Sequence, residues 1–184
     1  MCGVVGYIGD KQAASVLVDG LRRLEYRGYD SAGIAVVSGG QIASGKEVGR
    51  LANLEKSLSG APIEGSCGIG HTRWATHGVP SQANSHPHFS PDGSVSVVHN
   101  GIIENYAELR DALSAQGHVF LSETDTEVVP HLIEQALKDG ANSPAEALRG
   151  TLKKLRGAYA LGVLFRDEPE TVYCARLGSP LIIG

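Results

Sequence analysis

Short apolar runs bounded by glycine alternate along this chain with segments whose apolar residues recur at helical spacing. The run at residues 4–8 predicts a buried strand, and apolar positions from Ala13 to Leu24 predict a helix directly after it. A turn is expected at Ser38-Gly39-Gly40. Further strands are predicted at residues 33–37, 67–71, 95–99, 158–165, 171–175 and 181–183.

Three more helices are predicted in the second half of the chain. An apolar pattern over residues 103–117 indicates the first. Thr124 and Glu127 have the spacing of a capping box, which predicts the start of the second. Ser143 followed by Pro144 is a strong start signal for the third, because serine caps and proline fits the first helical position.

The number of predicted strands is larger than one solvated sheet would use, and many strands are apolar on both faces. The helices come in pairs between groups of strands. This order predicts an α+β protein in which two stacked sheets are covered by helices, an αββα sandwich of four layers.

Composition limits the class of protein. The 184 residues suffice for one domain, or at most two small ones, and 42% are hydrophobic against 20% charged, as in globular proteins. A net charge of -4 without a basic run argues against nucleic-acid binding. No apolar stretch approaches the ~20 residues of a membrane helix, and no leader is visible, so we expect a cytoplasmic protein.

Three widely spaced cysteines favour reduced thiols over disulfides. Cys67 and Cys174 lie in apolar surroundings and are interpreted as small buried hydrophobic residues. Cys2 differs, because removal of Met1 would leave it with a thiol and a free α-amine. The amine could then take the thiol proton, so that nucleophile and base belong to one residue. By itself this pattern is weak evidence for a nucleophile, since a cysteine can stand at position 2 by chance or as a buried residue that begins a strand.

Five blocks of sequence strengthen this hypothesis. They are Tyr-Arg-Gly-Tyr-Asp-Ser-Ala-Gly at 26–33, His-Thr-Arg-Trp-Ala-Thr-His-Gly at 71–78, Asn-Ser-His-Pro-His at 84–88, Val-His-Asn-Gly-Ile-Ile-Glu-Asn at 98–105 and Ser-Glu-Thr-Asp-Thr-Glu at 122–127. In this order, behind Met-Cys-Gly, they resemble the class II glutamine amidotransferases. These belong to the N-terminal-nucleophile hydrolases, whose fold is the αββα sandwich. The spelling of the first two blocks resembles the branch that uses fructose 6-phosphate as acceptor.

The resemblance covers the chain from Cys2 onward and implies an enzyme that hydrolyses L-glutamine through a thioester, without cofactor. In the family this domain continues beyond the segment resembling 178–184, and a sugar-phosphate isomerase domain follows. We therefore expect residues 1–184 to be one glutaminase domain, incomplete at its C-terminus, with fructose 6-phosphate bound only by the missing domain. Full-length members are expected to be homo-oligomers.

The resemblance also implies roles for individual residues. Asn100 and Gly101 match the oxyanion-binding pair, although Asn-Gly is also typical of a tight turn. Arg73 matches the residue that binds the substrate carboxylate, and Asp125 the one that binds its ammonium group. The alternatives are a solvated arginine and an acid that favours the first turn of a helix.

Other matches carry less certain roles. Thr76 and His77 resemble residues of the substrate pocket. Trp74 matches a residue that gates an ammonia tunnel, although a packing role is commoner for tryptophan. Arg27 resembles a residue near the catalytic amine, and its alternative is a structural salt bridge.

Seven histidines raise the question of a metal, but neither a two-cysteine knuckle nor a His-Glu-x-x-His helix is present. The histidines are interpreted as hydrogen-bonding residues in loops around the site. Two rival functions stay open at this stage. One is a related amidotransferase with another acceptor, such as an amidophosphoribosyltransferase. The other is a chain that binds glutamine, or fails to fold, without turnover.

Overall fold

The computed structural model describes residues 2–74 and 78–184, apart from the side chain of Arg27. Within these residues eight strands form two antiparallel sheets of four strands each. The first sheet has the order β1-β4-β2-β3, with β1 (Gly3–Ile8), β4 (Cys67–Arg73), β2 (Ser31–Ser38) and β3 (Gln41–Val48). The second has the order β5-β6-β7-β8, with β5 (His88–Phe89), β6 (Val95–Ile103), β7 (Gly157–Phe165) and β8 (Tyr173–Leu177).

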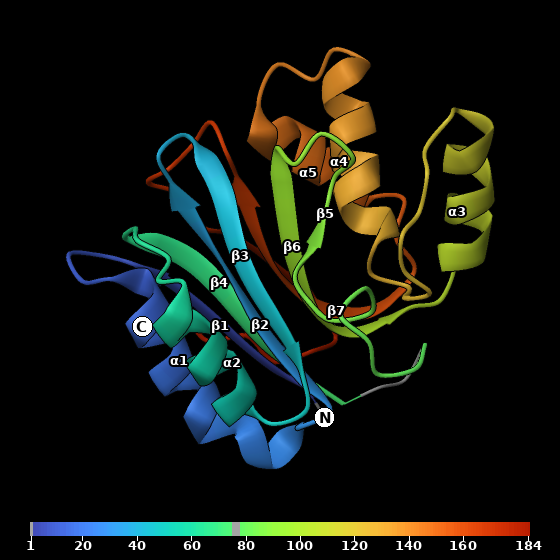
Figure 1. Ribbon diagram of the computed structural model, residues 1–184. Helices are drawn as coiled ribbons and strands as arrows, with labels where there is room; N and C mark the ends of the chain where they lie inside the picture. Colours follow the sequence, from blue (N-terminus) through green and yellow to red (C-terminus); the bar gives the residue numbers. More distant parts are fainter. Residues whose placement is uncertain (1, 75–77) are drawn as a thin grey trace.

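The helices cover the outer faces of the stacked sheets, as Figure 1 shows. Helices α1 (Ala13–Leu24) and α2 (Leu51–Gly60) pack on the first sheet, and a short 3₁₀ turn, Glu25–Arg27, follows α1. Helices α4 (Val128–Lys138) and α5 (Pro144–Leu152) lie over the second sheet, and α3 (Tyr106–Ala115) packs beside α4. The predicted αββα sandwich is therefore confirmed.

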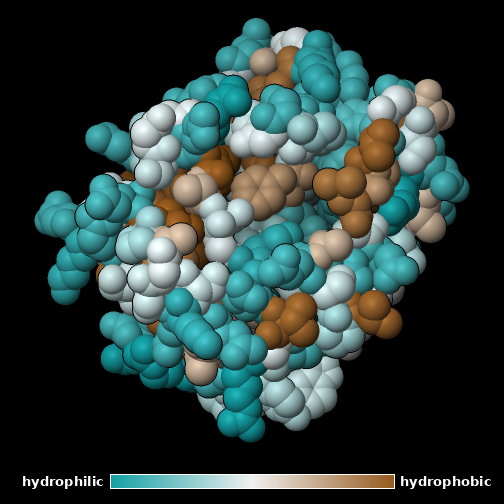
Figure 2. Space-filling model, in the orientation of Figure 1, coloured by the Kyte–Doolittle hydropathy of each residue, from teal (hydrophilic) through white to brown (hydrophobic). Residues whose placement is uncertain are grey.

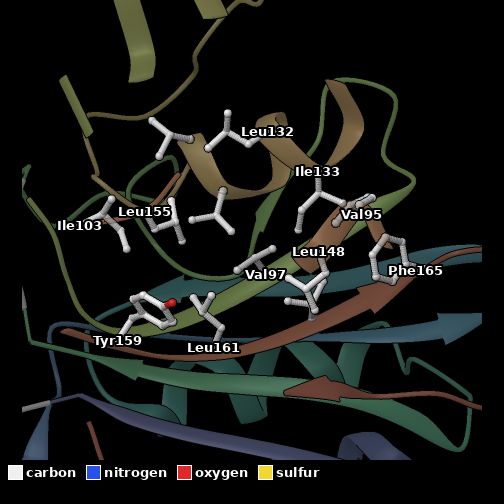
Figure 3. Close-up of a cluster of buried hydrophobic side chains, with 14 of the residues drawn as sticks. Val95, Val97, Ile103, Leu132, Ile133, Leu148, Leu155, Tyr159, Leu161 and Phe165 are labelled. Atoms are coloured by element: carbon white, nitrogen blue, oxygen red, sulfur yellow. The ribbon is translucent and has the colours of Figure 1, made fainter. Parts of the chain in front are cut away.

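Three apolar layers hold this arrangement together. One lies between α1, α2 and the first sheet and includes Leu17, Leu21 and Ile34. A second fills the space between the sheets, and a third lies between the second sheet and helices α4 and α5 (Figure 3). The third layer is contributed by β6, β7 and both helices, with Val97, Ile133, Leu148, Leu161 and Phe165 among its residues.

Figure 2 shows one face of the molecule, and this face is mostly hydrophilic. Its hydrophobic residues are separated into small patches. None of the helices in the described residues has the length and apolar character that crossing a bilayer requires.

Several predicted elements are confirmed closely. Helix α1 begins at Ala13 and ends at Leu24, as the apolar spacing indicates. The predicted start of α5 is also found, since the Ser143 hydroxyl accepts a hydrogen bond of 3.2 Å from the Glu146 N–H and Pro144 occupies the first turn. These elements are defined by local signals, which a sequence displays directly.

Other predictions are wrong. Strand β6 continues to Ile103, so α3 begins three residues later than expected. The capping box is not formed, because the Glu127 carboxylate accepts from the N–H groups of Leu121 and Ser122, each at 2.8 Å. The Thr124 hydroxyl contacts His88 instead. Residues 181–183 form no strand, and β3 and α2 were not anticipated.

Removing a buried side chain from the layer between the sheets should destabilise the whole sandwich. Ile69 on β4 is fully buried in this layer. We expect Ile69→Ala to lower the free energy of unfolding by about 2–5 kcal/mol, because it removes apolar contact and leaves a cavity. Urea unfolding measures this loss. The matched control is Ile182→Ala at a residue that is 91% exposed, where a change beyond about 0.5 kcal/mol would contradict the assignment.

Candidate active site

A small cavity where the two sheets meet collects most of the predicted residues. Its volume is about 20 Å³, and it is lined by Cys2, Arg73, Trp74, His86, His99, Gly101, Thr124, Asp125 and Thr126. Five of these were predicted from sequence, and they come from distant parts of the chain. His86, His99, Thr124 and Thr126 were not predicted as residues of the site.

The two sheets contribute opposite sides of the cavity. Cys2 directly precedes β1, and Arg73 is the last residue of β4. These strands pair with Gly3 opposite Thr72, which brings Cys2 to the same end as Arg73. Gly101 lies on β6 of the second sheet, and Asp125 lies in the loop before α4.

The thiol of Cys2 is held by the backbone at the end of β4. Its Sγ accepts from the N–H of Trp74 at 3.3 Å and lies 3.6 Å from the Trp74 carbonyl oxygen. Burial raises the pKa of the thiol, and the hydrogen bond from Trp74 opposes this only in part. At neutral pH the thiol is therefore protonated, and reaction as a thiolate requires a base that removes its proton.

Arg73 is buried, which rules out the alternative of a solvated arginine. One end of its guanidinium donates to the Gly78 carbonyl oxygen at 3.0 Å, and Nη1 lies 4.0 Å from the carboxylate of Asp30. These contacts fix a planar positive group in the wall of the cavity. Such a group can bind a carboxylate through paired hydrogen bonds.

Asp125 is also buried, with only 5% of its surface exposed. It does not lie in the first turn of α4, which begins at Val128, so the alternative of a helix-dipole acid is wrong. Its Oδ2 accepts from the backbone N–H of Ile103 at 2.8 Å. This bond joins the loop to the end of β6, two residues beyond Gly101.

The Asn100-Gly101 pair does not form a turn, because both residues lie within β6, opposite Ala160 and Tyr159. Gly101 has φ +145°, and a Cβ there would come within 2.0 Å of the Ala158 carbonyl oxygen. Only glycine fits this backbone. Asn100 is half-buried beside the cavity without lining it, and its side chain makes no hydrogen bond to the residues that the structure describes.

The remaining predicted residues have different outcomes. Trp74 is about half exposed at the rim, where its ring meets Tyr29 edge-to-face with 5.6 Å between centroids. Thr76 and His77 lie outside the described residues. The backbone of Arg27 ends the 3₁₀ turn, while its side chain lies outside the described part, so its proposed role is not tested.

Four histidines, His71, His86, His88 and His99, form a buried cluster, and three of these four lie on strands rather than in loops. His71 is on β4 and His99 on β6, and the Nε2–H of His71 donates to the His99 carbonyl oxygen at 2.8 Å. The ring of His86 stacks on His71 at 4.0 Å and meets His88 edge-to-face at 4.7 Å. Burial lowers the pKa of His71 and of His88 to about 3, and that of His86 well below its usual value.

Other features of the described residues do not compete with this site. No group of three or more potential metal ligands is found among them. A cavity of about 560 Å³ lies between α1 and α2 and contains none of the predicted residues. Arg22 in that cavity is already paired with Asp19 and Glu55.

Comparison with known proteins shows the family to which the chain belongs. Residues 71–179 match the glutamine amidotransferase domain family, and the chain belongs to that family. Over 184 residues it is 55% identical to the isomerizing glutamine–fructose-6-phosphate aminotransferases of Clostridium tetani and Pyrococcus horikoshii. The alignments cover 100% of this chain but only 30% and 31% of those relatives, so the chain spans about a third of their length.

Solved structures support the same fold. The glutamine phosphoribosylpyrophosphate amidotransferase of B. subtilis, solved with ADP and GMP, superposes with a TM-score of 0.77 at 29% identity. That match covers 90% of this chain and 35% of the other. A structure described as the allosteric regulatory enzyme of purine biosynthesis gives 0.79 at 30% identity, over 90% of this chain and 36% of its own.

The histidine cluster should make the protein sensitive to acid. Because the pKa values of His71 and His88 are lowered from about 6.5 in the unfolded chain, the unfolded state binds protons first as pH falls. The contribution of these two groups to stability is therefore fully present above about pH 6.5 and is lost as the pH falls toward 3. We expect a loss of about 2 kcal/mol per pH unit below pH 6, measured by urea unfolding at pH 7, 6 and 5.

The variant His71→Gln tests the assignment of this loss. Glutamine can still donate to the His99 carbonyl oxygen, but it does not titrate. The slope of stability against pH is set by the number of protons taken up on unfolding, and this number should fall by about one. An unchanged slope would show that the acid sensitivity comes from other groups.

Proposed function

We propose that this domain hydrolyses glutamine to glutamate and ammonia, with the Cys2 thiol as nucleophile after Met1 has been removed. The observation that carries the proposal is the common cavity. A thiol, a buried guanidinium, a backbone glycine and a buried carboxylate meet there from four separate segments of the chain. Membership of the glutamine amidotransferase family supports glutamine as the ligand.

Substrate binding uses the two buried charges. The guanidinium of Arg73 binds the α-carboxylate of glutamine, and the carboxylate of Asp125 binds its α-ammonium group. Thr76 and His77 contribute further to this pocket. Arg73 ends a strand of the first sheet, and Asp125 lies in a loop that is hydrogen-bonded to the second sheet. The amino-acid end of the substrate bridges the two charges while its amide reaches Cys2.

Activation of the nucleophile follows from the raised pKa of the thiol. The free α-amine of Cys2 has an ordinary pKa of about 7.7–8.0 and removes the thiol proton, directly or through a water. Arg27 lies in a block implied to be near this amine and supports its position. No histidine is needed as base, which agrees with the lowered pKa values of His71 and His86, because burial makes both imidazoles poor proton acceptors.

The chemical steps then balance. The thiolate forms a bond to the amide carbon, and the oxyanion is bound by the N–H of Gly101 and the side-chain amide of Asn100. The carbon–nitrogen bond breaks as the ammonium group of Cys2 returns its proton, and ammonia leaves. Water hydrolyses the thioester, which releases glutamate and restores the thiol.

The ammonia has a use only within a larger enzyme. The relatives are named for transfer of nitrogen from glutamine to fructose 6-phosphate. In such an enzyme, a homo-oligomer with a second, sugar-phosphate domain, the ammonia would convert fructose 6-phosphate to glucosamine 6-phosphate. Trp74 is about half exposed and lines the cavity, and in this proposal it gates the exit of the ammonia.

Loss of the thiol should abolish the reaction. We expect Cys2→Ala to reduce glutamate release to background, by at least about 10³-fold, because the thioester cannot form. Glutamate release is followed enzymatically, and intact mass of the same sample shows whether Met1 has been removed.

The matched control is Cys174→Ala, which should leave the rate unchanged. Cys174 is exposed, so its interpretation as a buried residue is wrong, whereas Cys67 is buried as predicted. If Cys2→Ala retains activity, the mechanism is wrong. If the folded wild-type chain has lost Met1 and still releases no glutamate, this domain does not turn over by itself.

Loss of the oxyanion donor should affect kcat more than KM. We expect Asn100→Ala to lower kcat by about 10²–10³-fold, because the donor is used in the transition state. Steady-state kinetics with glutamine measure both constants. Asn142→Ala, at an exposed residue, is the control. A normal kcat in Asn100→Ala would remove this residue from the oxyanion site.

A further inference from the structure

The hydroxyl of Thr126 occupies a three-way contact behind the predicted ammonium site. Its Oγ1 lies 2.9 Å from Nδ1 of His99, 3.0 Å from Nε2 of His86 and 3.5 Å from Oδ1 of Asp125. All four residues are buried and all line the cavity. The hydroxyl therefore lies between two imidazoles and the only carboxylate in the described wall of the site.

The hydrogen-bonding capacity of these groups fixes where the protons are. A hydroxyl has one hydrogen and can accept two bonds, while a carboxylate can only accept. Nδ1 of His86 has no partner in the described part of the chain, so a hydrogen there would be an unsatisfied buried donor. The hydrogen of His86 is therefore on Nε2, and it is donated to Thr126.

For His99 the position of the hydrogen follows from the neighbouring carboxylate. Its Nδ1 lies 4.0 Å from Oδ2 of Asp125, and a hydrogen on Nδ1 is favoured by the nearby carboxylate. With both imidazoles donating to Thr126, the hydroxyl hydrogen is left for Oδ1 of Asp125. The bond is long at 3.5 Å, so it orients the carboxylate without neutralising it.

We propose that Thr126 is a positioning residue that determines specificity for the α-ammonium group of the substrate. Its hydroxyl accepts the Nδ1–H of His99, so this hydrogen is not donated to the Asp125 carboxylate. The carboxylate retains its remaining lone pairs for a cationic ligand. This inference rests on the proposed glutamine site, and within it assigns a role to a residue that does not itself bind the substrate.

The consequence of removing the hydroxyl follows from the distances. Without Thr126 Oγ1, the Nδ1–H of His99 has Oδ2 of Asp125 as an acceptor after a movement of about 1 Å from the present 4.0 Å. That bond would be assisted by charge and would use the carboxylate that the ammonium group needs. Affinity should fall for ligands with an α-ammonium group and stay unchanged for ligands without one.

The test compares two ligands that differ only in this group. Binding of L-glutamine and of 4-carbamoylbutanoate, which is glutamine without its amino group, is measured by calorimetry on the whole chain carrying Cys2→Ala. The missing thiol prevents turnover, so the result does not depend on whether the domain is catalytic. Thr126→Val and Thr126→Ser are then introduced, and Asp125→Asn serves as the reference for loss of the ammonium site.

We expect Thr126→Val to weaken glutamine binding by about 10- to 150-fold, the range for a hydrogen bond to a charged group, and to change the analogue by less than about twofold. Thr126→Ser keeps the hydroxyl and should bind both ligands within about threefold of the parent. Asp125→Asn should reproduce the selective loss. If Thr126→Val weakens both ligands equally, or neither, the inference is overturned.

Two further outcomes are distinguishable. A parent chain that binds glutamine but whose thiol-containing form releases no glutamate contradicts the proposed catalysis and leaves the binding test of Thr126 valid. A parent that binds neither ligand contradicts both. If Thr126→Val does not unfold cooperatively on heating, Thr126→Cys replaces it, since a thiol is a weaker donor of similar size and should give a smaller but still selective loss.

Discussion

The face-to-face packing of the two sheets is the constraint on which the rest of this structure depends. Cys2 and Arg73 belong to one sheet, whereas Gly101 and the backbone that holds Asp125 belong to the other. The cavity exists only while the sheets keep their relative position. The apolar layer around Ile69 supplies cohesion, and the buried hydrogen bond from His71 to the His99 carbonyl oxygen supplies direction, because it is satisfied in only one register.

Burial of the polar cluster behind the site costs less free energy than its composition suggests. Each imidazole whose tautomer is defined donates its single N–H to an acceptor. Burial lowers the pKa values of His71, His86 and His88 so far that these three imidazoles stay neutral at neutral pH. Charged groups lie beside this neutral cluster: the guanidinium of Arg73 is 4.0 Å from the Asp30 carboxylate, and the Asp125 carboxylate accepts from the Ile103 N–H at 2.8 Å. Each charge therefore has a partner in the protein while its residue lines the cavity that also holds the thiol.

The sequence allowed prediction of the layers and most of the site, but for different reasons. Helices α1 and α5 were predictable because apolar spacing and the Ser143 cap are local signals. The capping box at Thr124 failed because tertiary contacts engage that hydroxyl and the Glu127 carboxylate elsewhere. Cys2, Arg73, Gly101 and Asp125 were found through short blocks that resemble a family. The proposed role of Thr126 could not be predicted, although Thr126 follows Asp125 directly, because its partners His86 and His99 are distant in sequence and adjacent only in the fold.

One feature of the rim has an optical consequence. Trp74 is the single tryptophan of the chain and is about half exposed. Its backbone N–H donates a hydrogen bond to the sulfur of Cys2. All indole fluorescence of the molecule therefore originates at the mouth of the cavity. A ligand that displaces water there, or a covalent change at the sulfur, alters the environment of that one indole. The protein therefore carries an intrinsic fluorophore at its proposed active site, so occupancy of the cavity can be followed in real time without a label.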